Sequence, residues 1–283
     1  MGGSYLTPDI AVVTDSTADI PPKYVEQYSI HVIPNIIVID GRSLEDGIDI
    51  SRQEFYIKLA SMKSLPTTAT AASGAYSEKY EFLLNQGYNH IISIHPPAQL
   101  SGIYNAAWIA AQEFEPKVTL LDGKQLSLGM GFQVIEAAKS AQLGEPLEKI
   151  LSYLEDVRRR IRLFAMLDTL EYIRRSGRVS WARARLGDLL RIKPFLEVRD
   201  GQVNSMGEAR TYQKGLARLR ELLIDLGPLE KLAILHTNAE DQARRFLSSL
   251  PEPLPPEPLF VNVNSVIGTH VGPNGIGFTA ILR

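Results

Sequence analysis

The chain has 283 residues, of which 45% are hydrophobic and 22% are charged, a composition that is typical of globular proteins and excludes disorder over most of the chain. The length suggests two domains or one large one, and the formal net charge of -2 gives the chain no overall electrostatic drive toward nucleic acid. There is no cysteine, which excludes disulfides, thiolate zinc sites, iron–sulfur clusters and cysteine nucleophiles.

In the first half, short β-branched runs alternate with helical patterns. Strands are predicted at Ile10–Thr14, His31–Ile39, His90–Ile94 and Val118–Leu121. Helices are predicted to begin at Pro21–Pro22, after Ser73 and at Ser101. A capping box of Ser51 and Glu54 predicts another helix from Ser51 to Ser61. Two more helices are predicted at Gln125–Ala141 and Pro146–Arg158. This alternation indicates a mainly parallel sheet covered by helices.

The second half begins near Ile161 and mixes hairpins with helices. Strands are predicted at Phe164–Leu167, Leu232–Leu235, Leu259–Val263 and Ile276–Leu282, and a hairpin joins Pro194–Val198 to Gln202–Met206 through Asp200–Gly201. Helices are predicted on both sides of Gly177 and at Arg210–Leu226 and Glu240–Leu250. We place a domain boundary near residue 158, so the sequence predicts two α/β domains, 1–158 and 159–283.

The location of the protein is indicated by what its sequence lacks. The opening MGGSYLTPD has neither the basic start nor the apolar core of a signal peptide. No stretch approaches the roughly 18 apolar residues that a membrane span needs. Together with the absence of cysteine, these features favour a cytoplasmic location.

Charge is distributed unevenly along the chain. Residues 158–199 contain 12 basic and 4 acidic residues, so the remainder is acidic. One interpretation is that these arginines lie on solvated helix faces. The other is a docking face for an anionic partner or a membrane surface. Aromatic residues do not alternate with the arginines as they do in single-strand binders, which again disfavours nucleic acid.

Five polar or glycine-rich clusters stand out, several of them directly after strands, where α/β proteins place ligands. They are TDSTAD from Thr14, PTTATAASG from Pro66, LSGIY from Leu100, RRSGRVS from Arg174 and GTHVGPNGIG from Gly268. Caps and turns explain any one of them. Hydroxyls at helix starts also offer donors to a carboxylate or phosphate. Four glycines and a proline around His270 favour a functional role for that histidine.

Familiar catalytic patterns are missing from the sequence. It contains no G-x-S-x-G elbow, no phosphate-binding G-x-x-x-x-G-K-[ST] loop and no H-E-x-x-H pair. The five histidines lack metal-ligand spacing. No metal or other cofactor is therefore expected.

In this order, the five clusters resemble those of the DegV family of bacterial fatty-acid-binding proteins. VVTDSTADIPP is similar to the start of the family, PTTATAASGAY stands in place of its Thr-Ser-Gln-Pro-Ser segment, and ISIHPPAQLSGIYNAA stands in place of its Ser-Gly-Thr-Tyr segment. LEYIRRSGRVS resembles its Gly-Gly-Arg segment, and GTHVGPNGIG is the most specific match. The resemblance covers essentially the whole chain.

The resemblance implies one long-chain fatty acid, such as palmitate, stearate or oleate, in an apolar cleft between two α/β domains. It implies that Thr68, Ser101, His270, Arg178 and Arg210 bind the headgroup. In one branch of the family a separate fatty acid kinase converts the bound acid to an acyl phosphate. The resemblance thus implies a kinase partner and a lipid-binding protein without a catalytic nucleophile, and we favour a monomer.

The sequence departs from the family pattern beside the expected site. Alanines replace polar residues after Thr68, Ile103 follows Ser101–Gly102, and Ser176 replaces the first glycine before Arg178. These changes put headgroup geometry and kinase coupling in question.

Two alternatives stay open. One is an acyl- or phosphoryl-transfer enzyme with Ser101 or Thr68 as nucleophile and His270 as base. The other is an interaction module that docks through its arginines.

Overall fold

The first sheet is parallel, as predicted. The computed structural model describes residues 9–184 and 192–283. Within this part, strands β1 (Ile10–Asp15), β2 (His31–Ile33), β6 (His90–His95) and β7 (Val118–Asp122) form a four-stranded sheet in the order β2-β1-β6-β7. Every pair is parallel. The carboxyl ends of these strands therefore share one edge of the sheet, and the loops that follow them lie close together.

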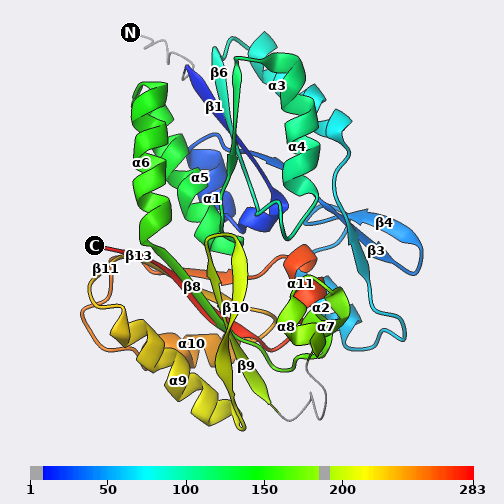
Figure 1. The fold of residues 1–283 in the computed structure, drawn as a ribbon, viewed down its shortest axis with the longest axis vertical. Helices are drawn as coiled ribbons and strands as arrows, with labels where there is room; N and C mark the ends of the chain where they lie inside the picture. Colours follow the sequence, from blue (N-terminus) through cyan, green and yellow to red (C-terminus); the bar gives the residue numbers. More distant parts are fainter. Residues whose placement is uncertain (1–8, 185–191) are drawn as a thin grey trace.

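Helices cover both faces of this sheet (Figure 1). Along β1, Ile10 and Val12 pack against α5 (Ser127–Gln142) and α6 (Leu147–Arg160), while Ala11 and Val13 pack on the other side, against α3 (Ser73–Asn85) and α4 (Ile103–Ala111). Successive strand residues point to opposite faces, so a strand buried on both faces is a continuous apolar run. The short helix α1 (Pro22–Gln27) begins at the predicted proline pair.

The second sheet has six strands and is mixed rather than parallel. Its order is β10-β9-β8-β13-β11-β12, and only β11 and β12 run parallel. Its strands are β8 (Ile161–Met166), β9 (Lys193–Arg199), β10 (Gln202–Ala209), β11 (Leu229–His236), β12 (Leu259–Asn262) and β13 (Ile276–Leu282). The predicted β9–β10 hairpin is present and antiparallel. The last strand, β13, lies in the middle of the sheet between β8 and β11.

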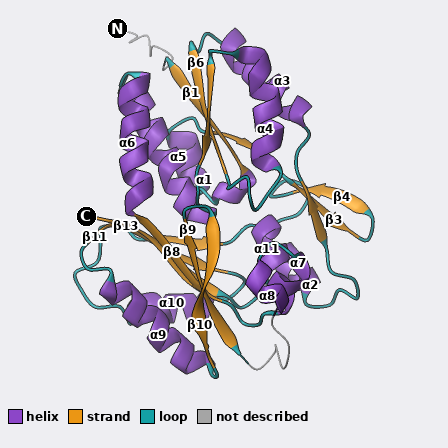
Figure 2. Cartoon of the chain, in the orientation of Figure 1, coloured by secondary structure: helices purple, strands orange, loops and turns teal. Residues whose placement is uncertain are grey.

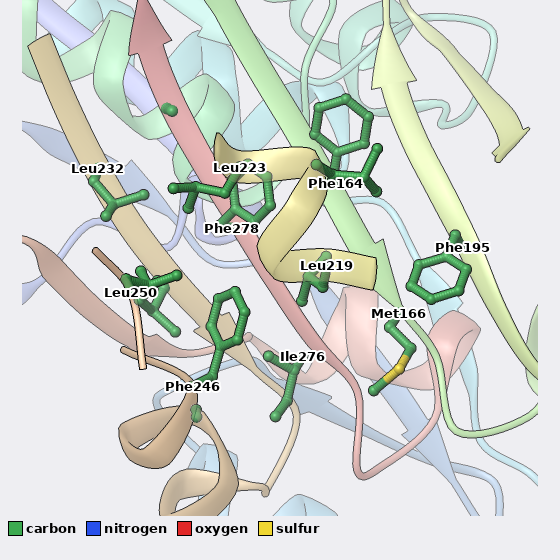
Figure 3. Close-up of a cluster of buried hydrophobic side chains, with 14 of the residues drawn as sticks. Phe164, Met166, Phe195, Leu219, Leu223, Leu232, Phe246, Leu250, Ile276 and Phe278 are labelled. Atoms are coloured by element: carbon green, nitrogen blue, oxygen red, sulfur yellow. The ribbon is translucent and has the colours of Figure 1, made fainter. Parts of the chain in front are cut away.

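Two helices, α9 (Tyr212–Asp225) and α10 (Glu240–Ser248), cover one face of this second sheet (Figure 2). The core beneath them contains Phe164 and Phe278, whose rings are 5.5 Å apart, together with Phe246 and Leu219 (Figure 3). The opposite face packs against α5 and α6 through side chains such as Leu128, Phe132 and Val157. Helix α5 is therefore buried on both sides, which explains its apolar sequence.

A third sheet was not predicted. Strands β3 (Ile36–Ile39), β4 (Arg42–Glu45) and β5 (Thr67–Ala69) form an antiparallel sheet in the order β4-β3-β5. The predicted strand His31–Ile39 is wrong in one respect, because it divides into β2 and β3 in different sheets. Helix α2 (Arg52–Leu59) begins behind the predicted capping box and packs with this small sheet against α11 (Ser265–Val271).

Short elements complete the described chain. They are the 3-10 turns Ser16–Ala18 and Gln112–Phe114 and the helices α7 (Glu171–Ser176) and α8 (Ser180–Ala184). None of the helices in the described ranges is long and apolar enough to cross a membrane. The predicted boundary near residue 158 falls in the last turn of α6; the division into domains 1–158 and 159–283 stays a prediction.

Candidate functional site

A largely apolar cavity lies between the parallel sheet and the six-stranded sheet. The space between its lining residues is about 1140 Å³ when the open mouth is counted. Its walls come from both halves of the chain. The apolar lining includes Leu163, Leu167, Leu196, Val198, Leu235 and Val263.

Thr68 and His270 meet at this cavity, although they are 202 residues apart in the sequence. Thr68 lies in β5 and His270 in the last turn of α11. The Thr68 hydroxyl and His270 Nε2 are 3.1 Å apart, within hydrogen-bond distance, and either atom can donate. The structure thus brings together two of the predicted site residues from opposite ends of the chain.

His270 is neutral at physiological pH. Burial, and secondarily the charge of nearby Arg178, lowers the pKa of His270 to about 4. Both causes act against the imidazolium form. At neutral pH the imidazole is therefore an uncharged hydrogen-bonding group, and the charge that can balance an anion in the cavity comes from Arg178.

Acidification from pH 7 to pH 5 should destabilise the wild-type protein more than a His270→Gln variant. The unfolded chain takes up a proton near the ordinary pKa of about 6.5, whereas the folded protein resists protonation down to about 4. Stability falls as the pH drops through this window, and the His270 contribution is about 2 kcal/mol between pH 7 and 5. Urea unfolding at both pH values measures it, and equal losses in the two proteins would contradict the assignment.

Ser101 lies at the cavity, just before α4. The sequence predicts it as the helix N-cap, but that position is taken by Gly102. The Ser101 hydroxyl instead accepts the Ile103 N–H at 3.2 Å. The β5 loop is adjacent, since a Cβ built on Gly102 would be 3.3 Å from the Thr70 hydroxyl. The loop after β5 and the loop before α4 therefore lie side by side at the cavity.

Arg178 also lines the cavity, in the turn that follows α7. Gly177 has a φ of 68°, the left-handed conformation expected there, and ends the helix. The Ser176 hydroxyl accepts the Arg178 N–H, and Arg178 Nη1 donates to the Ser176 carbonyl at 2.8 Å. Arg178 is exposed overall. Its guanidinium therefore lies where the cavity meets solvent.

Arg210 is not brought to this site. It is exposed in the turn between β10 and α9, and it is absent from the described residues that line the cavity. The structure thus groups Thr68, Ser101, Arg178 and His270 and leaves Arg210 apart.

The polar lining residues that the sequence-based predictions did not name include Thr17, Ser127, His236 and Thr237. Thr17 follows β1, and its N–H and hydroxyl both donate to the buried Asp15 carboxylate. Ser127 opens α5 with a φ of 49°, and its hydroxyl donates to buried Asp19 at 2.6 Å. The TDSTAD cluster gave a signal for Thr17. Ser127 carried none, because nothing in its neighbourhood marks a ligand.

Ser93, His95 and Asp15 form a hydrogen-bonded series in the parallel sheet. His95 Nδ1 lies 2.7 Å from Asp15, and His95 Nε2 lies 2.7 Å from the Ser93 hydroxyl. All three side chains are fully buried, and Ser93 also contacts the Tyr80 hydroxyl. A nucleophile needs access to substrate. This series therefore fits a structural network that supports the edge of the parallel sheet.

The arginine-rich stretch from residue 158 to 199 is largely ion-paired where it is described. Arg158 pairs with Glu155, Arg160 with Asp156 and Glu230, and Arg175 with Glu171. Its members Arg185 and Arg191 lie outside the described residues. The pairs support the interpretation that this stretch forms solvated helix faces.

Fold and site together define an α/β protein with an apolar cavity between its two larger sheets, bordered at one place by hydroxyl, imidazole and guanidinium groups. The sequence profile described as "Uncharacterised protein, DegV family" matches residues 9–283. The chain belongs to the DegV family.

Individual relatives agree over nearly the full length. A DegV domain-containing protein of Listeria innocua is 33% identical over 275 residues, which is 95% of this chain and 97% of the relative. A DegV family protein of Thermus thermophilus, whose structure was described for its fatty acid binding, matches with a TM-score of 0.87 at 30% identity, over 97% of this chain and 99% of the other. DegV of Bacillus subtilis, described as a fatty acid binding protein, matches with a TM-score of 0.85 at 31% identity. The match covers 98% of this chain and 100% of the other.

Proposed function

We propose that this protein binds one long-chain fatty acid in the cavity, with its tail along the apolar walls and its carboxylate at Thr68, Ser101, His270 and Arg178. The observation that carries the proposal is the composition of the cavity, whose lining is mostly apolar apart from this cluster and a few other polar residues, among them His236 and Thr237. The fatty acid binding described for the Thermus thermophilus and Bacillus subtilis relatives supports it.

The chemistry of the cluster suits a carboxylate. A carboxylate removed from water must receive hydrogen bonds or a counter-charge, or it takes up a proton. Two hydroxyls and a neutral imidazole can donate, and the guanidinium of Arg178 supplies the positive charge. A hydrocarbon chain contributes about 0.8 kcal/mol for each buried CH2. The tail then sets affinity, and the polar cluster sets orientation.

We further propose that the protein presents the carboxylate to a separate fatty acid kinase, as a cytoplasmic monomer that supplies no nucleophile. The exposure of Arg178 at the cavity supports this, because a partner can reach the headgroup from that side. His270 Nε2 lies beside Thr68, and the Ser101 hydroxyl accepts a backbone N–H. This arrangement does not favour Ser101 as a nucleophile with His270 as its base, and it leaves Thr68, which contacts His270, as the nucleophile of the enzyme alternative.

Extraction of the purified protein with organic solvent, followed by mass spectrometry, tests lipid binding. About one fatty acid per chain is the expected result. Absence of lipid, together with no uptake of added palmitate or oleate, would overturn the proposal.

Kinase coupling is tested in a separate experiment. The lipid-loaded protein is incubated with ATP and a bacterial fatty acid kinase, and the expected product is an acyl phosphate, which hydroxylamine traps.

Thr68→Val should weaken palmitate binding by about tenfold or more, because a hydrogen bond to a charged group contributes roughly 1.5–3 kcal/mol. Valine keeps the shape of threonine and removes only the hydroxyl. Competition against a fluorescent fatty acid measures the change. Thr67→Val, on the exposed neighbouring side chain of β5, is the matched control and should leave affinity unchanged. Equal affinities in the two variants would remove Thr68 from the site.

A further inference from the structure

Four segments of the chain converge on the N-terminal end of α11. They are the loop after β1 with Asp19, the segment from Asp46 to the first residue of α2, Arg52, the start of α5 with Ser127, and the connection from β12 into α11 at residues 262–265. We call this set of contacts the α11 junction. It lies at the opposite end of α11 from His270.

The carboxylate of Asp19 is the centre of the junction. It is 1% exposed and accepts the Asn264 N–H at 2.9 Å and the Ser127 hydroxyl at 2.6 Å. Arg52 Nη2 lies 3.1 Å from the same carboxylate. Asp19 has a φ of 56°, which places it in the left-handed region at the end of a 3-10 turn. A strained, buried acidic residue persists only where its contacts fix it.

Arg52 connects Asp19 to the polypeptide on the other side of the junction. Its Nη1 donates to the carbonyl of Asn262, the last residue of β12, at 2.5 Å. Asp46 accepts the Ser265 N–H at 3.2 Å, at the first residue of the helix. Two consecutive backbone N–H groups at the start of α11 thus bind two different carboxylates.

The electrostatic balance at the junction depends on Arg52. Burial raises the pKa of both Asp19 and Asp46. The positive charge of Arg52 acts in the opposite direction and lowers the pKa of each. Asp46 in turn raises the pKa of Asp19 by like-charge repulsion. Loss of the guanidinium would leave two buried carboxyl groups close together without a cation, which is strongly unfavourable for both charges.

The junction is mechanically connected to the headgroup site. Helix α11 has seven residues, so its first residue and His270 are roughly 8 Å apart along the axis. Gly268, between them, packs directly on Tyr56, and Tyr56 donates a hydrogen bond to the Val263 carbonyl at 3.1 Å. A shift or rotation of α11 at its start therefore moves His270 relative to Thr68, which lies on β5.

We propose that Arg52 and Asp19 are positioning residues for the headgroup site: the ion pair fixes the start of α11 and so aligns His270 with Thr68. The inference rests on the proposed function, since it assumes that these two side chains face a carboxylate. It assigns to the TDSTAD cluster a role that helix capping alone does not give it. Neither Arg52 nor Asp19 lines the cavity, so neither touches the ligand directly.

The test compares palmitate with hexadecanol, which has the same tail length and no carboxylate. In wild-type protein, palmitate should bind more tightly than the alcohol. In Arg52→Gln, palmitate affinity should fall by about tenfold while hexadecanol affinity stays within about twofold, because only the headgroup contacts are misaligned. The imidazole signals of His270 in a proton–nitrogen NMR spectrum should shift at the same time. Arg52→Lys, which keeps the charge, should recover part of the loss.

Lys58→Gln is the matched control, since Lys58 lies in the same helix and has no ion pair among the described residues. It should change neither the ratio of palmitate affinity to hexadecanol affinity nor the imidazole signals of His270. If wild-type protein binds neither lipid, the proposed function fails. If it prefers palmitate and Arg52→Gln keeps that preference with an unshifted His270 signal, only the positioning role is overturned. Should Arg52→Gln not fold, Arg52→Lys decides: a reduced preference for palmitate with a shifted His270 signal supports the positioning role, and an unchanged preference with an unshifted signal overturns it.

Discussion

Replacement of Gly131 by alanine should lower the free energy of unfolding by about 3 kcal/mol, at the upper end of what overpacking costs. Gly131 lies in the second turn of α5, and a Cβ there would overlap the backbone carbonyl of Ala18 and lie 2.9 Å from Leu128 and 3.3 Å from Ile20. The Ala18 carbonyl belongs to the backbone and cannot rotate away, and Ala18 is buried against the helix. The expected loss exceeds the roughly 1 kcal/mol that alanine gains over glycine inside a helix.

Urea unfolding followed by circular dichroism measures this effect. Gly74→Ala is the matched control, because Gly74 lies in the first turn of α3 and a Cβ there meets nothing within 4 Å. That variant should be neutral or slightly more stable. A Gly131→Ala protein as stable as the wild type would show that α5 can move away from β1, and the close packing described for this helix would be wrong.

Palmitate should bind about 200-fold more tightly than laurate. The two acids differ by four methylene groups, and each buried CH2 contributes about 0.8 kcal/mol, which gives about 3 kcal/mol in total. The headgroup is the same in both, so the difference reports the cavity walls alone. Competition binding across a series of saturated acids measures it.

Ala165→Phe provides the matched variant for this series. Ala165 on β8 lines the cavity, and a phenyl ring would occupy space that the tail needs. The variant should lose more affinity for palmitate than for laurate. Equal affinities for all chain lengths in the wild-type protein would place the tail outside this cavity.

The parallel sheet was predictable from sequence because its strands are buried on both faces. Ile10–Val13 is a continuous apolar run, His90–His95 contains three isoleucines, and each strand is followed by a helical pattern. The three-stranded sheet was only partly predictable. Strand β3 is apolar and was included in the predicted strand His31–Ile39, but β4 and β5 are short, largely polar and partly exposed, so their composition resembles that of loops. Only the tertiary contact with α2 and α11 makes them a sheet.

The candidate site was predictable in composition and only partly in geometry. Thr68, Ser101, Arg178 and His270 lie in recognisable clusters, and all four line the cavity. The glycines around His270 suggested an irregular backbone, yet Ser265–Val271 is helical, because the Asn264 side chain caps its start. Arg210 was assigned by resemblance alone and lies elsewhere. The contact between Thr68 and His270 depends on the fold, which no local pattern reveals.

The central place of β13 has a genetic consequence. Among the described strands, β13 alone joins the β8–β9–β10 part of the six-stranded sheet to the β11–β12 part. A stop codon at residue 276 would remove this strand, divide the sheet in two and open the core beneath α9 and α10. A nonsense mutation there should therefore be as damaging as one far upstream.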